Sequence, residues 1–177
     1  MKKKLMTALF VISFNVFANT NFDYSFEYLL GFEGSTVDRT IENIHSKFGV
    51  TKGTLKRYNG RTDVQNLTLS TAKDVVYKLY WKAYELDRFM DKRNALLVLD
   101  FIYNSSSHNA IKQIQMAIGN KVTGRLSVSD IAKINYMGYK DFYKVYSKQR
   151  LGYMMKLKNY QKYKTGWGRR VESLGKL

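Results

Sequence analysis

Hydrophobic residues near the start of the chain recur with the period of an α-helix. They stand at i, i+4, i+7 and i+8, at Phe22, Phe26, Leu29 and Leu30. This spacing places apolar side chains on one face of a helix. Gly34 suits the left-handed position that follows a last helical turn. The pattern predicts an amphipathic helix that ends near residue 34.

The stretch that follows has a different character. Residues 34–66 show no sustained period, which predicts an irregular segment with a small hairpin around KFGVTKGTLKRYNG (47–60). Helical patterns then return, with a start near Ser70 and Thr71-Asp74 at capping-box spacing. Further helices are predicted over 95–104, 107–118, a short one opened by Ser127-x-x-Asp130, and 139–157. The fold class predicted from these patterns is mainly α, with one irregular or hairpin segment after the first helix.

Composition narrows the chemistry. The 177 residues are 45% hydrophobic, enough for a packed core in one domain or one domain with a small appendage. The absence of cysteine excludes disulfides, zinc ribbons and a cysteine nucleophile. His45 and His108 are the two histidines, which argues against a multi-histidine metal site. We expect no metal and no cofactor.

The N-terminus has the pattern of an export signal. Three lysines at 2–4 precede an apolar run over 5–17, and Val16-Phe17-Ala18 suits a cleavage site. A bilayer span needs about 20 apolar residues, more than this run provides. We predict a signal peptide over 1–18, a mature start near Asn19 and a periplasmic or secreted protein without a stable membrane span. The alternative is an uncleaved membrane anchor.

The net charge points to acidic partners. Loss of three lysines with the signal would lower the formal charge from +16 to +13. An exported protein this basic is expected to meet polyanions: peptidoglycan, lipopolysaccharide, anionic membrane or nucleic acid. The tail YQKYKTGWGRR (160–170) interleaves bases with aromatics, a pattern that also binds single-stranded nucleic acid. Because a signal peptide argues against that destination, we expect no nucleic acid.

Glu33 lies in line with the apolar stripe of the first helix. On a helical projection it falls about 20° from Phe22 and Phe26, whereas Glu27 falls about 140° from Phe22 on the polar side. A carboxyl beside an apolar wall has a raised pKa, and it can donate a proton near neutral pH. The alternative is a helix-end glutamate that reaches water or pairs with a base.

The order of several short motifs resembles glycoside hydrolase family 108, the N-acetylmuramidases of phage-type endolysins. In that family a leading helix ends in Glu-Gly-Gly-Tyr, a loop runs to a Gly-Ile-Thr segment, and later helices carry Tyr-Trp, Asp-Phe…Asn, Arg-x-x-Tyr and Gly-Trp-x-x-Arg. The matching stretches here are FEGST (32–36), SKFGVT (46–51), LYWKAYELDRF (79–89), VLDFIYNSSSHNAIKQIQMAIG (98–119), RLGYMMKL (150–157) and GWGRR (166–170).

The resemblance implies a lysozyme-like fold with two functional halves. It implies a catalytic half over 19–105 and a helical, peptidoglycan-binding-like half over 106–177, packed together as one globular unit. It also implies a monomer that hydrolyses the glycan strands of peptidoglycan. The chain departs from the family where DRTIENIHS (38–46) replaces an Asp-Pro-Gly-Gly loop. That change leaves the second carboxylate open and allows altered or lost activity.

The resemblance gives Glu33 the role of general acid. Glycoside hydrolysis usually needs a second carboxylate, and Asp38 and Glu42 in the following loop are both candidates. Ser46 and Thr51 flank the Gly-Val turn, where their hydroxyls serve either the turn or a bound water or sugar.

Three further site residues have two readings each, and Asp100 is considered with them. Tyr80 and Trp81 can stack on sugar rings or pack in a core. Asn104 is either a helix cap or a contact to a substrate amide. Asp100, inside an apolar helix, is expected to be a hydrogen-bonded structural acid with an arginine partner such as Arg150.

Two other functions remain open at this point. One is a catalytically impaired cell-wall-binding module of the same fold. The other is a surface or nucleic-acid binder driven by charge alone.

Overall fold

The computed structural model describes residues 20–32, 38–40 and 43–177. The chain divides into two compact units between Ala83 and Tyr84. The described residues are mostly helical, which confirms the predicted fold class. The functional division predicted between residues 105 and 106 stays a prediction. Among the described residues, no helix combines the length and apolar character needed to cross a bilayer.

The first helix of the first unit spans 20–32. Phe22, Phe26 and Leu29 are buried, whereas Glu27 is exposed. The stripe predicted from the hydrophobic period is therefore the buried face of this helix. Gly34, its predicted terminator, lies outside the described residues.

A three-stranded antiparallel sheet follows, with strand order β1-β2-β3. The strands are β1 (Asp38–Thr40), β2 (Asn43–Lys47) and β3 (Val50–Thr51). Phe48 and Gly49 join β2 to β3 with positive φ values of 53° and 75°. Two such residues form the type I′ turn that matches the twist of a hairpin. The predicted hairpin is confirmed for this part.

The rest of that predicted hairpin is wrong, because Lys52–Asn59 forms the helix α2. Only Leu55 of α2 is buried, so the helix has no repeating apolar stripe for a periodicity argument to detect. Its caps define it instead. Thr51 accepts a hydrogen bond from the backbone N–H of Thr54, and Gly60 ends the helix at φ 79°.

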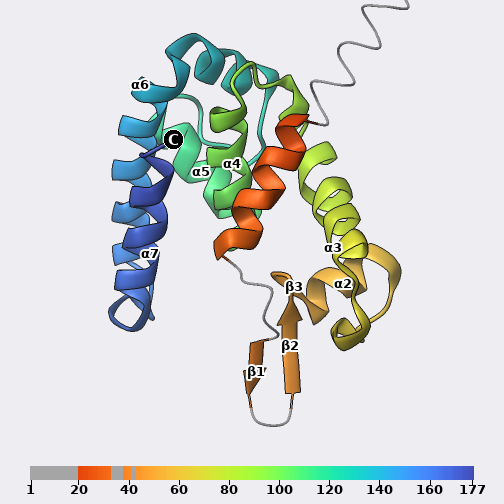
Figure 1. Ribbon diagram of the computed structural model, residues 1–177. Coiled ribbons are helices and arrows are strands. Elements are labelled where there is room, and N and C mark those ends of the chain that lie inside the picture. The colour runs from red at the N-terminus through yellow and green to blue at the C-terminus, as the bar shows by residue number, and fades with distance from the viewer. Residues whose placement is uncertain (1–19, 33–37, 41–42) are drawn as a thin grey trace, which may run out of the picture. The chain divides into compact units, whose positions relative to one another are not determined.

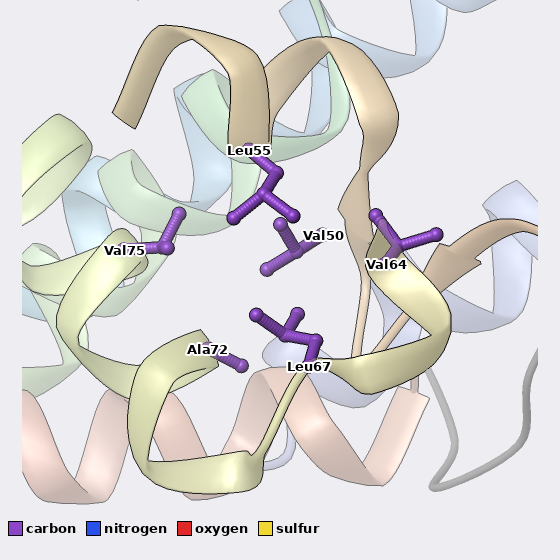
Figure 2. Packing of buried hydrophobic residues seen from close by; sticks show 6 residues of the cluster. All are labelled: Val50, Leu55, Val64, Leu67, Ala72 and Val75. Carbon is purple, nitrogen blue, oxygen red and sulfur yellow. The ribbon is translucent and has the colours of Figure 1, made fainter. Parts of the chain in front are cut away.

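One apolar cluster joins the hairpin to the rest of the first unit (Figure 2). It is formed by Val50, Leu55, Val64, Leu67, Ala72 and Val75. These residues come from β3, α2, the 3-10 turn η1 (Val64–Asn66), the residue after it, and α3 (Leu69–Val76). Thr68, rather than Thr71, caps α3, since its hydroxyl accepts from the N–H of Thr71 at 3.1 Å. A π-helical turn, η2 (Tyr77–Lys82), continues α3.

The second unit is built around a buried helix. It contains the 3-10 turn η3 (Leu86–Arg88), α4 (Lys92–Asn104), α5 (Ser107–Ala117), α6 (Val128–Met155) and α7 (Tyr160–Leu174). In α4 every residue from 94 to 102 is buried, as predicted from its apolar sequence. Figure 1 shows α6 and α7 side by side as an antiparallel hairpin.

The N-terminus of α6 is fixed by buried polar groups. Ser127 and Asp130 form the predicted capping box, and Gln115 donates to Asp130 at 2.9 Å. Gln115 also accepts from the N–H groups of Thr123 and Gly124, so one side chain holds the connection between α5 and α6. Gly138, at φ 70° and ψ 173°, interrupts α6 where two separate helices were predicted.

Asp100 lies at the centre of a buried ionic cluster. Its carboxylate accepts from Arg150 at 2.5 Å and from Arg170 at 2.7 Å, and Arg150 also donates to the Tyr146 hydroxyl. Asp100 and Arg150 have no exposed surface, which confirms the predicted pair. Burial alone would raise the pKa of Asp100, but the two guanidinium groups outweigh it and hold that pKa below its usual value.

This cluster predicts a specific loss of stability. Asp100→Asn leaves two buried guanidinium groups without their anion, so we expect the free energy of unfolding at pH 7 to fall by about 3–5 kcal/mol. Because the folded-state pKa is lowered, Asp100 contributes fully above about pH 4 and loses its contribution as pH falls through the lowered pKa. Urea unfolding at pH 7 and pH 3 measures both effects.

Glu172→Gln is the matched control, since it removes an exposed carboxylate paired with Lys176 in the same unit. We expect that variant to unfold like the wild type. If the free energy of unfolding of Asp100→Asn at pH 7 lay within about 1 kcal/mol of the wild-type value, the structural role of the cluster would be contradicted.

Candidate active site

The predicted acids lie at or beyond the limits of the described structure. Glu33 and Glu42 lie outside the described residues. The backbone of Asp38 lies at the start of β1, and its side chain lies outside what the structure describes. The described residues nearest to these acids in sequence belong to the first helix and to the three-stranded sheet.

The sheet register brings three predicted site positions into one row. Asp38 pairs with Ser46, and Ser46 pairs with Thr51. Paired residues on antiparallel strands have Cα atoms about 4.5–5.5 Å apart. The backbone positions of Asp38, Ser46 and Thr51 therefore lie next to one another across all three strands, although thirteen positions separate the first from the last in sequence. We call these three residues the sheet row.

A bulge adjoins the sheet row. Asp38 pairs with Ser46, whereas Arg39 pairs with Ile44, so the register shifts by one residue of β2. An extra residue in one strand bends that strand and changes the direction of neighbouring side chains. This irregularity falls within DRTIENIHS, the segment that departs from the family pattern.

Thr51 is held in place from two sides. Its neighbour Val50 is fully buried in the apolar cluster. Its own hydroxyl accepts from the N–H of Thr54 at 3.1 Å and lies 3.0 Å from the Thr54 hydroxyl. The side chain is nevertheless exposed, so Thr51 combines a capping role with access to solvent.

Tyr80 and Trp81 have a packing role in this structure. Trp81 has no exposed surface, and its ring lies 5.4 Å from the ring of Phe22. Tyr80 is 6% exposed, and its hydroxyl accepts from Arg57 at 3.0 Å. A buried ring offers no face to a sugar, so the predicted stacking does not fit either residue as placed here. Both instead connect η2 to the first helix and to α2.

Asn104 ends α4 in the second unit. Its side-chain amide donates to the carbonyl oxygen of Asp100 at 2.8 Å, one turn earlier in the helix. The side chain therefore folds back onto its own helix, and Ser105 is the C-cap residue of α4. A cap at Asn104 is not observed, and the contact to a substrate amide stays a prediction.

A comparison with protein families matches the segment that contains these residues. Residues 26–106 match the family model described as Glycosyl hydrolase 108. Over these residues, which make up less than half of the chain, the sequence is similar to that family. The resemblance predicted from the motifs is confirmed over this segment, and the motifs at 150–157 and 166–170 lie outside it. The family segment contains all eight predicted site residues and ends two residues after α4.

A comparison with solved structures found a similar fold. The structure of SagA from Brucella abortus matches with a TM-score of 0.78 and 22% sequence identity, over 89% of this chain and 93% of that chain. At that identity the likeness concerns the fold. No curated protein sequence matches the chain at a significant level.

The glycosyl hydrolase 108 segment is strongly basic near the sheet row. From 43 to 60 the sequence contains four lysines and arginines and no acid: Lys47, Lys52, Lys56 and Arg57. Such a run creates a positive potential that attracts anionic substrates. The sequence analysis did not place these bases on a helix, because α2, which carries three of them, lacks an apolar period. The signals that could have revealed α2 are its cap residues, Thr51 and Gly60.

The capping role of Thr51 can be tested with two substitutions. Thr51→Val removes the hydroxyl that caps α2, and we expect it to lower the free energy of unfolding by about 1 kcal/mol. Thr51→Ser keeps the hydroxyl and should unfold nearly like the wild type. Denaturant titration of both variants measures the difference in stability. Equal stability of Thr51→Val and Thr51→Ser would contradict the capping role.

Proposed function

We propose that the chain is an exported muramidase that cleaves the glycan strand of peptidoglycan, with Glu33 as the general acid. The observation that carries the proposal is the family match over residues 26–106, which includes Glu33 and the whole sheet row. The buried stripe of the first helix supports it further, because Glu33 directly follows that helix in sequence. A carboxyl in that neighbourhood suits proton donation to a leaving oxygen.

The sheet register favours Asp38 as the second carboxylate. Its backbone position pairs with Ser46, next to Thr51, and it follows Glu33 by five residues. Glu42 falls between β1 and β2 in sequence and stays the second candidate. A separation of about 5–5.5 Å between the two carboxyl groups would give retention of configuration, and a longer one inversion. Ser46 and Thr51 are proposed to hold a water or a sugar hydroxyl beside this acid.

The charge of the chain supports a cell-wall substrate. The basic run over 43–60 lies within the family segment, and the peptide stems of peptidoglycan carry carboxylates. The predicted signal peptide would deliver the protein to the compartment that contains this polymer. Export, monomeric state and the preference for this glycan are parts of the proposal.

Glu33→Gln tests the proposal directly. The mature protein from Asn19 is mixed with purified sacculi, and turbidity and soluble fragments are followed over time. We expect clearing by the wild type and a loss of about 100-fold or more in Glu33→Gln, because the amide cannot supply the proton. Glu27→Gln is the matched control on the exposed face of the same helix and should clear at the wild-type rate.

The outcomes separate the possible functions. Equal clearing by wild type and Glu33→Gln would contradict the role of Glu33. Wild-type protein that sediments with sacculi without releasing fragments would support the catalytically impaired wall-binding module instead.

The two candidates for the second carboxylate give opposite expectations. Asp38→Asn should lower the clearing rate by at least about 100-fold, whereas Glu42→Gln should retain most of it. Circular dichroism confirms that both variants fold. The reverse ranking would assign the role to Glu42 and contradict the argument from the register.

A further inference from the structure

The end of the α6–α7 hairpin carries charge of a single sign. From 142 to 171 the sequence contains nine lysines and arginines and no aspartate or glutamate. Arg150 and Arg170 neutralise Asp100 in the interior. The remaining seven are exposed: Lys144, Lys148, Lys156, Lys158, Lys162, Lys164 and Arg169. Four of them, from Lys156 to Lys164, lie at or beside the connection between the two helices.

The same end exposes large apolar side chains. We define the hairpin tip as residues 151–167, which comprise the last turn of α6, the connection and the first half of α7 (Figure 1). Met155 is 61% exposed, Tyr163 is 42% exposed and Leu151 is 36% exposed. Leu151 and Met155 stand four residues apart on α6, and so on one face of that helix.

Aromatic rings accompany these residues on α7. The ring of Trp167 lies 5.6 Å from that of Tyr163 and 6.4 Å from that of Tyr160. Tyr160 and Trp167 are half-buried. The hairpin tip thus combines a short aromatic row, exposed aliphatic side chains and lysines without any acid.

The combination of lysines, aromatic rings and exposed aliphatic side chains fits some anionic partners better than others. A soluble polyanion such as a nucleic acid or a glycan chain needs bases and stacking rings, but it gains little from exposed methionine and leucine. A lipid surface uses all three features. Phosphate headgroups attract lysine, tryptophan and tyrosine favour the headgroup boundary, and aliphatic side chains enter the outer acyl region.

We propose that the hairpin tip binds the surface of an anionic lipid bilayer. The lysines lie against the headgroup phosphates, and Leu151, Met155, Tyr163 and Trp167 reach the boundary between headgroups and acyl chains. The tip lies outside the family segment at 26–106, so the proposal does not depend on the hydrolase activity. It would hold the enzyme at a membrane surface next to the polymer that it is proposed to cleave.

The chain contains a reporter for this contact. It has two tryptophans, and Trp81 is fully buried in the first unit. Trp167 is half-buried in the tip. Addition of vesicles of phosphatidylcholine with 30% phosphatidylglycerol should shift tryptophan emission to shorter wavelength and cosediment the mature protein. Vesicles of phosphatidylcholine alone should do neither, and Trp167→Phe should abolish the shift.

Two pairs of variants test the proposed surface. The tip variant converts Lys156, Lys158, Lys162 and Lys164 to Gln. The control makes the same charge change at Lys56, Lys121, Lys133 and Lys140, which are exposed elsewhere. We expect the tip variant to lose at least roughly tenfold in vesicle partitioning and the control to lose less than about threefold. Met155→Ser should lose about fivefold or more, whereas Met90→Ser, exposed outside the tip, should lose nothing.

Three results would overturn the proposal. The first is equal loss in the two lysine variants, which would indicate unspecific charge attraction. The second is vesicle binding without any change in Trp167 emission. The third is that the protein binds a single-stranded oligonucleotide at least as tightly as it binds vesicles, and that Met155→Ser changes neither the oligonucleotide binding nor the vesicle binding.

Discussion

The change from a buried side chain at Val50 to an exposed one at Thr51 is the constraint on which the first unit depends. Val50 is fully buried and Thr51 is exposed, as expected for neighbours in a strand with one covered face. A slip of one residue would turn Val50 out to solvent and take Thr51 into the apolar cluster. The burial of Val50 thereby favours the register that pairs Thr51 with Ser46 and places Thr51 at the start of α2. The pairing of Asp38 with Ser46 depends in addition on the bulge between Asp38 and Arg39.

The second unit depends on a charge instead. Asp100 lies in α4, in which every residue from 94 to 102 is buried and an unpaired carboxylate would be very unfavourable. Arg150 from α6 and Arg170 from α7 compensate it, so three helices are joined at one carboxylate. Arg150 directly precedes the hairpin tip in sequence and Arg170 follows it by three residues, so the buried cluster joins the helices of the tip to α4, while the lysines of the tip itself are exposed. This arrangement separates the bases that stabilise the fold from those proposed to bind a membrane.

The sequence predicted those features that have a repeating or paired signal. The stripe of the first helix, the buried α4, the box of Ser127 and Asp130, and the pairing of Asp100 with Arg150 were all predicted. Helix α2 was missed because a single buried leucine gives no period. Arg170 was missed because the two ends of a long-range ion pair carry no local signal. The burial of Trp81 could not be deduced either, since a tryptophan at a helix end has the same sequence whether it faces a groove or the core. The alignment of Asp38 with Thr51 required the strand register, which only the three-dimensional structure gives.

These features support one account of the chain. The segment that matches Glycosyl hydrolase 108 contains Glu33, directly after the first helix in sequence, and the three backbone positions of the sheet row. The most direct measurement is the chemical identity of the fragment ends that the mature protein releases from purified peptidoglycan. The account predicts new reducing ends of N-acetylmuramic acid, detected by borohydride reduction and mass spectrometry. Fragments with reducing N-acetylglucosamine ends, or cleavage confined to the peptide stems, would contradict it.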